Sequence, residues 1–121
     1  MKKQKNGKTI KPPVNKQLLD EITERIVKEV KPEKIILFGS HAYGKPIKDS
    51  DLDFFIVKKT KLPVSKRFGM VSDALFPRLI PMDFVVRTPQ EIDSRLKGFD
   101  PFLNEVLNRG KILYEKKRQY R

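Results

Sequence analysis

The chain has 121 residues and a mass of 14.2 kDa, and 27 Lys and Arg against 15 Asp and Glu give it a net charge of +12. This length predicts one domain with a single hydrophobic core. The absence of cysteine excludes disulfides, thiolate metal sites and cysteine nucleophiles, and the single histidine, His41, excludes sites that need two imidazoles. No apolar run approaches the ~20 residues that span a bilayer, and no apolar stretch follows the basic N-terminus as in a secretory signal, so we expect a cytoplasmic protein.

The positive charge is concentrated at the two ends of the chain. Residues 1–16 contribute +6 and residues 109–121 contribute +5, whereas residues 17–108 contribute only +1. A basic excess of this size suggests a polyanionic partner such as a nucleic acid, but here the terminal segments would have to make the contact.

The same division predicts the domain organisation. Residues 1–14 contain two consecutive prolines and few apolar side chains, which predicts a flexible basic arm. We expect the folded domain to cover residues 15–114 and a basic tail to cover residues 115–121.

A helix and a strand are predicted at the start of the domain. Asn15 is a suitable N-cap for a helix over residues 16–31, and Pro32 ends it. Six apolar residues recur there at helical spacing and predict one buried face: Leu18, Leu19, Ile22, Ile26, Val27 and Val30. Residues 34–38 form a short apolar run that predicts a buried strand, and Gly39-Ser40 stops it.

The middle of the domain predicts a second strand and a second helix. Turn-forming residues separate Gly39 from an apolar run over residues 52–57, which predicts the strand. A basic connector over residues 58–62 follows. Residues 63–76 then show apolar residues at helical spacing, closed by Pro77, and we expect their Phe68–Phe76 portion to lie in the core.

The last part of the domain predicts a strand over residues 79–87 and further helix. Thr88, Pro89 and Glu91 have the pattern of an N-cap, N1 and N3. The helical pattern continues to residue 107 with an interruption near residues 98–101, and Gly110 precedes a candidate last strand over residues 112–114. Strands that alternate with helices predict an α/β or α+β domain.

Two aspartates begin the second strand. Asp51 and Asp53 are two positions apart, so their side chains point to the same side of the sheet. Ionising both is costly unless a cation lies between them, and Mg²⁺ suits one or two carboxylates completed by water and phosphate oxygens. The alternative interpretation is that they are ordinary turn acids.

Two further features fit the same chemistry. Glycine lets the backbone approach a ligand closely, so Gly39-Ser40 at the end of a buried strand is a candidate phosphate-binding turn. Asp83, in an otherwise apolar strand, is the best candidate for a third acid, because buried acids are rare unless paired or liganded. Its alternative is a solvated position on an edge strand. We expect His41 to be a surface loop residue and not a general base, and Tyr43 to be a packing or loop residue and not an acceptor.

Together, Gly39-Ser40-x-Ala42-x-Gly44, then Ser50-Asp51-x-Asp53 and a later lone aspartate, resemble the nucleotidyltransferase motif of the DNA polymerase beta superfamily. The short chain is most similar to the minimal nucleotidyltransferases (MNT family). The tight match covers residues 34–57 and a looser one covers residues 81–91.

The resemblance implies a small mixed sheet flanked by helices and a metal-dependent transfer reaction. It implies that Asp51 and Asp53 bind two Mg²⁺ ions, and that Asp83 completes one metal site and helps to deprotonate the attacking hydroxyl. Gly39 and Ser40, with Ser50 of the same motif, would bind the nucleoside triphosphate. The implied reaction transfers a nucleoside monophosphate from ATP or another NTP to an acceptor hydroxyl and releases pyrophosphate. With ATP, the transferred group is AMP.

The sequence departs from the family at Tyr43, where many relatives have arginine, and Lys45 or Lys48 is then a candidate for the missing charge.

The resemblance also implies a partner. Minimal nucleotidyltransferases are often encoded beside a helical HEPN protein and act as its antitoxin, by binding it or by transferring AMP to it, so we expect a homo- or hetero-oligomer. Two alternatives remain open: a catalytically silent module of the same fold that docks onto a partner, and a nucleic-acid binder that uses the basic ends.

Overall fold

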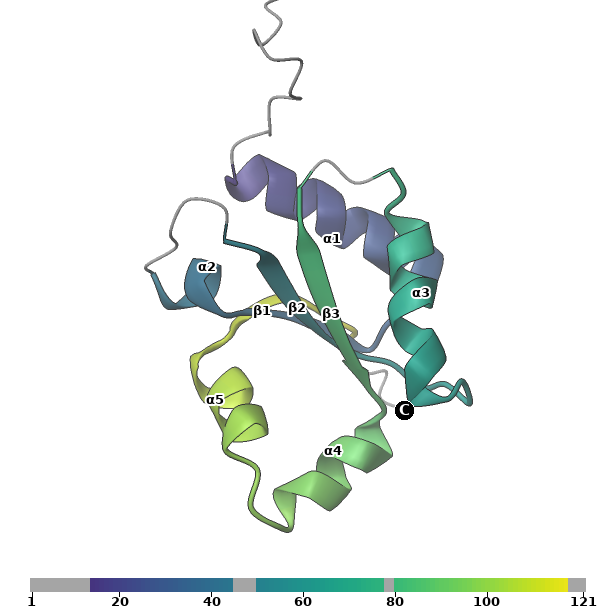
Figure 1. Cartoon of the computed structure of the whole chain (residues 1–121), viewed down its shortest axis with the longest axis vertical. Coiled ribbons are helices and arrows are strands. Elements are labelled where there is room, and N and C mark those ends of the chain that lie inside the picture. Colours follow the sequence, from purple (N-terminus) through teal and green to yellow (C-terminus); the bar gives the residue numbers. More distant parts are fainter. Residues whose placement is uncertain (1–13, 45–49, 78–79, 118–121) are drawn as a thin grey trace, which may run out of the picture.

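The structure is a computed structural model that describes residues 14–44, 50–77 and 80–117 (Figure 1). Along the chain, its helices and strands are α1 (Lys16–Val30), β1 (Lys34–Phe38), α2 (Ser40–Tyr43), β2 (Leu52–Val57), α3 (Val64–Ala74), β3 (Met82–Arg87), α4 (Pro89–Leu96), α5 (Pro101–Arg109) and β4 (Lys111–Glu115). The four strands form one sheet in the order β3-β2-β1-β4. Strand β1 is antiparallel to β2 and β4, and β2 is parallel to β3, which confirms the predicted mixed sheet flanked by helices.

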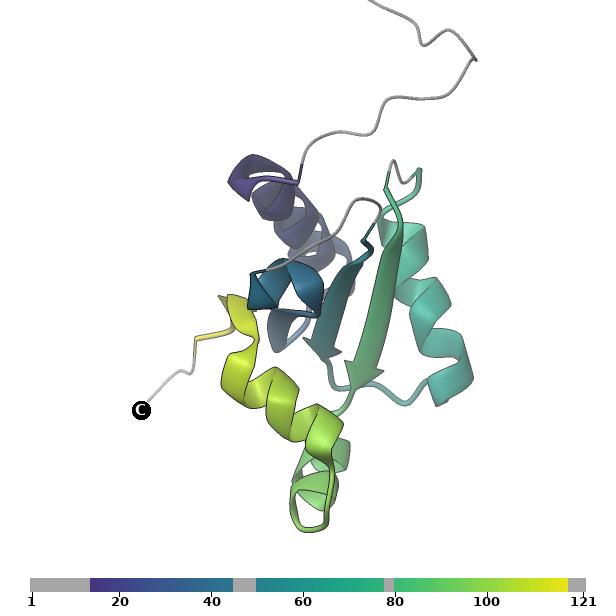
Figure 2. The same ribbon diagram turned by 60° about the vertical axis from the view of Figure 1, so that its left-hand side comes forward.

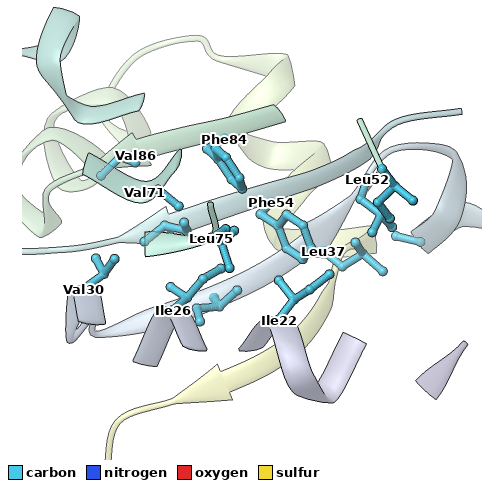
Figure 3. Close-up of a cluster of buried hydrophobic side chains, with 14 residues drawn as sticks. Ile22, Ile26, Val30, Leu37, Leu52, Phe54, Val71, Leu75, Phe84 and Val86 are labelled. Atoms are coloured by element: carbon cyan, nitrogen blue, oxygen red, sulfur yellow. The ribbon is translucent and has the colours of Figure 1, made fainter. Parts of the chain in front are cut away.

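Alternate residues of each strand face opposite sides of the sheet and form two apolar clusters. Leu52, Phe54 and Ile56 of β2 belong to the larger cluster, which α1 and α3 cover. Figure 3 shows residues of α1, α3 and the strands packed together in it. Phe55 and Val57 belong to the smaller cluster on the other face, which includes Leu103 and Val106 of α5. The sheet is therefore covered by α1 and α3 on one face, and α4 and α5 lie on the opposite face.

Helix α1 forms as predicted at its start and ends one residue earlier than predicted. The side chain of Asn15 accepts a hydrogen bond from the backbone N–H of Leu18 (2.9 Å), which satisfies a free donor of the first turn. The helix ends at Val30 because Lys31 takes a left-handed conformation with φ of 56°, and its N–H donates to the carbonyl of Val27 (3.1 Å).

Helix α3 is shorter than the predicted range of 63–76, and its aromatic residues are not all in the core. Val71 and Leu75 are buried, but Phe68 is 41% exposed and Phe76 is 78% exposed. The prediction that this segment is core is therefore wrong for these two phenylalanines. Phe68 lies at the rim, where its ring contacts that of Phe84 (5.3 Å between centroids), and Phe76 lies beyond the end of the helix.

The C-terminal part contains two separate helices, which explains the predicted interruption. Thr88 and Glu91 form a complete capping box at the start of α4. Asp100 starts α5, because its side chain accepts a hydrogen bond from the N–H of Leu103 (3.0 Å). Strand β3 begins at Met82, later than the predicted residue 79, which lies outside the described residues.

Strand β4 is longer than the predicted 112–114 and joins the edge of the sheet beside β1. It extends to Glu115, the first residue of the predicted tail, and the N–H of Lys116 donates to the carbonyl of Glu33 (2.9 Å). The predicted arm and most of the tail lie outside the described residues, so the domain limits stay a prediction. Within the described ranges, no helix is long and apolar enough to cross a membrane.

Candidate functional site

The three predicted acids lie near one end of the sheet, where β1 ends and β2 and β3 begin. Asp53 of β2 pairs with Asp83 across the parallel β2–β3 ladder and with Phe38 across the antiparallel β1–β2 ladder. Register partners point to the same face, so both carboxylates lie on the face that also carries α5. Asp51, one residue before β2, alternates onto the same side.

Like charges surround the carboxyl group of Asp53. Partial burial raises the pKa of this group, and the carboxylates of Asp83 and then Asp51 raise it further, while His41 opposes the shift. These are the effects expected when acids share a site without a neutralising cation. The structure therefore brings Asp51, Asp53 and Asp83 into one electrostatic neighbourhood.

The burial argument for Asp83 is corrected by the structure. Strand β3 is an edge strand, and Asp83 is exposed. Its Oδ1 accepts a hydrogen bond from the backbone N–H of Phe84 (2.9 Å). Asp83 belongs to the site because it is the register partner of Asp53, and not because it is buried. Its exposure leaves this carboxylate accessible to an incoming group.

Gly39 touches the acid site directly. It has φ of 78° and ψ of −164°, a conformation that is essentially restricted to glycine. A Cβ at this position would collide with Oδ2 of Asp53. Glycine is therefore required twice over, by the backbone conformation and by the close approach of the Asp53 carboxylate.

Ser40 and Ser50 lie on the two sides of the segment 45–49, which is outside the described residues. Ser40 is the first residue of α2, and the carbonyl of Gly39 accepts hydrogen bonds from the N–H groups of Ala42 and Tyr43 (both 3.0 Å). His41 is half-buried on α2, so its assignment to a surface loop is wrong. Its Nε2 lies 3.2 Å from the carbonyl oxygen of Ser50, to which it can donate when it carries the proton.

An arginine outside every sequence motif lies against α2. The guanidinium carbon of Arg109, the last residue of α5, is 4.3 Å from the centroid of the Tyr43 ring. Lys45 and Lys48, the predicted sources of positive charge, lie outside the described residues. Sequence reasoning missed Arg109 because it is 66 positions from Tyr43 and no local pattern indicates that α5 packs beside α2.

The acid cluster fits one kind of metal site and not another. In ranges 14–44, 50–77 and 80–117, no three His, Asp or Glu side chains converge closely enough to hold a metal ion by themselves. Mg²⁺ usually takes one or two carboxylates and completes its shell with water and substrate phosphates. The carboxylates of Asp53 and Asp83 can therefore contribute to an open Mg²⁺ site completed by water and phosphate oxygens, and not to a closed protein cage.

Two cavities differ in their relation to these acids. The larger, of about 710 Å³, lies at the opposite end of the sheet and is lined by charged residues that include Lys34, Lys59 and Glu115. A cavity of about 170 Å³ lies on the α5 face and is lined by residues that include Phe55, Phe102 and Arg87. Phe55 is two positions after Asp53, so this smaller cavity is on the face of the acids.

Comparisons with protein families and with solved structures find proteins similar to this chain. A family model described as polymerase beta, nucleotidyltransferase, matches residues 20–119. No curated protein matches the chain significantly. Among solved structures, one of a candidate nucleotidyltransferase from Sulfolobus solfataricus has a TM-score of 0.58 at 24% identity, covering 83% of this chain and 79% of that one.

Two further solved structures are toxin–antitoxin proteins. A mutant of the toxin–antitoxin MntA-HpeT has a TM-score of 0.58 at 18% identity, covering 86% of this chain and 76% of that one. A toxin–antitoxin solved with AMP-PNP has a TM-score of 0.58 at 20% identity, covering 82% and 74% of the two chains. At these identities the likeness shows a shared fold.

Proposed function

Because the chain belongs to the polymerase beta nucleotidyltransferase family, we propose that it is a Mg²⁺-dependent enzyme that transfers a nucleoside monophosphate from an NTP, AMP from ATP in the simplest case, to an acceptor hydroxyl. The observation that carries this proposal is the register pairing of Asp53 with Asp83, with Gly39 against the Asp53 carboxylate. In the proposed reaction these carboxylates hold Mg²⁺, and Mg²⁺ neutralises the charge of the phosphates.

Each site residue has a role in the proposal. Asp51, Asp53 and Asp83 hold two Mg²⁺ ions, and Gly39, Ser40 and Ser50 bind the nucleotide. Asp83 is exposed, so it can also accept the proton of the acceptor hydroxyl. The hydroxyl oxygen then bonds to the α-phosphorus, the bond from that phosphorus to the bridging oxygen breaks, and pyrophosphate leaves.

The test measures transfer of an α-phosphate label from NTP in the presence of Mg²⁺. We expect Asp53→Asn to reduce the rate by about 100-fold or more, because it removes a carboxylate that holds Mg²⁺ and so weakens the stabilisation of charge on the transferring group. Asp93→Asn, which changes an exposed acid on α4, is the matched control and is expected to retain the wild-type rate. Equal labelling by the wild type and by Asp53→Asn would contradict the proposal.

The acceptor in this proposal belongs to a partner protein of the helical HEPN type, which makes the chain the antitoxin of a pair. The toxin–antitoxin structures with the same fold support this. Leu96, the last residue of α4, and Phe99, in the turn before α5, are 45% and 92% exposed, and a partner could cover both. The test is co-expression with the product of the neighbouring gene and intact-mass measurement, in which the added mass of AMP is expected on the partner.

A partner that co-purifies unmodified, equally with the wild type and with an Asp51/Asp53 double variant, would favour the second candidate, a module that neutralises its partner by docking alone. Docking requires no chemistry at the acids, and the exposed Phe99 offers the same apolar contact to a partner in this alternative.

A further inference from the structure

Helix α5 brings a cation to the end of α2. Arg109 is the last residue of α5, and its guanidinium lies over the ring of Tyr43, the last residue of α2 (4.3 Å). Figure 2 shows the C-terminal end of α5 beside α2. Ser40 and Tyr43 are three positions apart on α2 and so lie on neighbouring parts of its surface. Tyr43, whose ring the guanidinium covers, is therefore about one helical turn from Ser40 of the Gly39-Ser40 turn.

The packing of α5 holds Arg109 at this end of the sheet. The ring of Phe102, at the start of α5, contacts those of Phe38 (5.4 Å between centroids) and Phe55 (6.4 Å). Val106, one turn before Arg109, is buried. Because Phe38 is the register partner of Asp53, the helix is anchored beside the row of the sheet that carries the acids.

The electrostatic surroundings of Tyr43 place the same groups together. Burial raises the pKa of its phenol, as do the carboxylates of Glu105 and Asp53, while the backbone amide of Gly39 and the guanidinium of Arg109 lower it. Arg109 and Asp53 therefore both act on one phenol, with opposite effects.

The site needs a cation for its ligand. The described part of the site contributes the carboxylates of Asp51, Asp53 and Asp83, and a triphosphate adds further negative charge. A guanidinium stacked on a ring can still direct its N–H fork outward, and this fork matches phosphate oxygens. The present partner of Arg109 is Glu105 (3.2 Å), and both side chains are about half exposed, so this ion pair is weak and can be exchanged.

We infer that Arg109, stacked on Tyr43, binds the terminal phosphates of the NTP. This rests on the proposed function and extends it, because it adds a phosphate-binding residue from α5, outside the sequence motif. Arg109 then distinguishes a triphosphate from a monophosphate, since it reaches the β- and γ-phosphates and not the nucleoside.

The experiment measures the affinity of the full chain for AMP-PNP and for AMP, both with Mg²⁺. Arg109→Ala is expected to weaken AMP-PNP binding by about 10- to 100-fold and AMP binding by less than about twofold. Arg109→Lys keeps the charge but loses the fork, so it is expected to recover part of the affinity.

Arg95→Ala is the matched control, because Arg95 is also an exposed arginine paired with a carboxylate, that of Asp100 (3.4 Å), and lies on α4. It is expected to change neither affinity. An Arg109→Ala protein with wild-type affinity for AMP-PNP, or with equal losses for AMP-PNP and AMP, would overturn the inference. A wild-type protein that binds AMP-PNP through Arg109 but transfers no label would overturn the proposed catalysis alone, and one that binds no AMP-PNP would overturn both.

Discussion

Asp53 and Asp83 face each other as register partners on parallel strands, and the backbone of Gly39 closes the space on the other side of Asp53. The fold therefore holds two like charges in adjacent positions and confines one of them. Such an arrangement costs stability when no cation is bound, because each carboxylate disfavours ionisation of the other. The loss of stability and the capacity to bind Mg²⁺ both come from the closeness of these two carboxylates.

Replacing Asp53 should therefore stabilise the metal-free protein. The pKa of Asp53 is raised above its ordinary 3.8. At a pH between these two values, the folded state therefore keeps a proton on Asp53 that the unfolded chain has lost. Stability consequently falls as the pH rises from about 3.8 through the raised pKa, and the full cost is present at neutral pH. We expect Asp53→Asn to raise the melting temperature by a few degrees at pH 7 with EDTA, and to leave it unchanged below the ordinary pKa.

The same melting experiment with Mg²⁺ and AMP-PNP provides the contrast. Ligands that bind only the folded state stabilise it, so the wild type should gain stability from them and Asp53→Asn should gain little. Asp93→Asn, on α4, should behave as the wild type under both conditions. An Asp53→Asn protein that is less stable than the wild type without metal would show that Asp53 serves the fold and not a ligand.

The glycine against Asp53 allows a second prediction. Gly39→Ala places a methyl group into Oδ2 of Asp53 and forces a conformation with φ of 78° on a residue with a side chain. We expect a loss of about 1–3 kcal/mol in the free energy of unfolding, together with loss of transfer activity. Gly69→Ala is the matched control: Gly69 lies within α3, nothing is within 4 Å of its added Cβ, and alanine favours a helix. That variant should gain about 0.5–1 kcal/mol in urea unfolding. Two variants of equal stability would contradict the prediction.

Much of the fold follows from local signals in the sequence. The apolar spacing of α1, the cap at Asn15 and the Thr88–Glu91 capping box act within a few residues, and all three appear as predicted. The exposure of Phe68 and Phe76 does not follow, because helical spacing identifies an apolar face but not how much of it a sheet covers. The edge position of β3 is equally non-local, since it depends on which strand β2 pairs with.

The candidate site divides in the same way. Strand alternation predicts that Asp51 and Asp53 lie on one side of the sheet. The contact of Gly39 with the Asp53 carboxylate depends in addition on the antiparallel pairing of β1 with β2. Asp83 was predicted on the ground of burial, and the structure places it beside Asp53 for a different reason, the register of β2 with β3. Arg109 required the packing of α5 against β1, which no pattern in the sequence indicates.

The salt bridge between Arg67 and Glu91 predicts a pH-dependent contribution to stability. Arg67 of α3 is 6% exposed, and its guanidinium makes two bonds to the carboxylate of Glu91 on α4 (2.7 and 3.1 Å). The hydrogen bonds from Arg67 and from the Thr88 N–H lower the pKa of Glu91 from 4.5 to about 2. The stabilisation is therefore complete above pH 4.5 and is lost as the pH falls from there to about 2.

We expect Glu91→Gln to reduce the free energy of unfolding by about 2–3 kcal/mol at pH 7, because it leaves the Arg67 charge buried without its partner. The loss is no larger because solvent screens part of the Glu91 carboxylate. The difference from the wild type should shrink between pH 4.5 and 2, as followed by urea unfolding. Asp20→Asn removes an exposed pair with Lys16 (2.7 Å) and should leave stability at the wild-type value. Equal effects of the two substitutions would contradict this prediction.

The concentration of positive charge at the ends of the chain gives the last prediction. A truncated chain of residues 14–117 removes seven of the 27 Lys and Arg and keeps the N–H of Lys116 that bonds to Glu33. If the ends bind nucleic acid, the truncated chain should bind single-stranded RNA more weakly. Its plot of log affinity against log salt concentration should also be shallower, by about 0.7 for each phosphate that the removed residues neutralise in the full chain.

The melting temperature and the transfer rate serve as controls, and both should stay at the wild-type values because the truncation leaves α1, β4 and the acids intact. A point variant with Lys97→Gln, which removes a cation from the end of α4, should leave the salt slope unchanged. RNA binding that is identical in the full and truncated chains would eliminate the nucleic-acid interpretation of the basic ends. The proposed transfer reaction would then depend on the near-neutral domain alone.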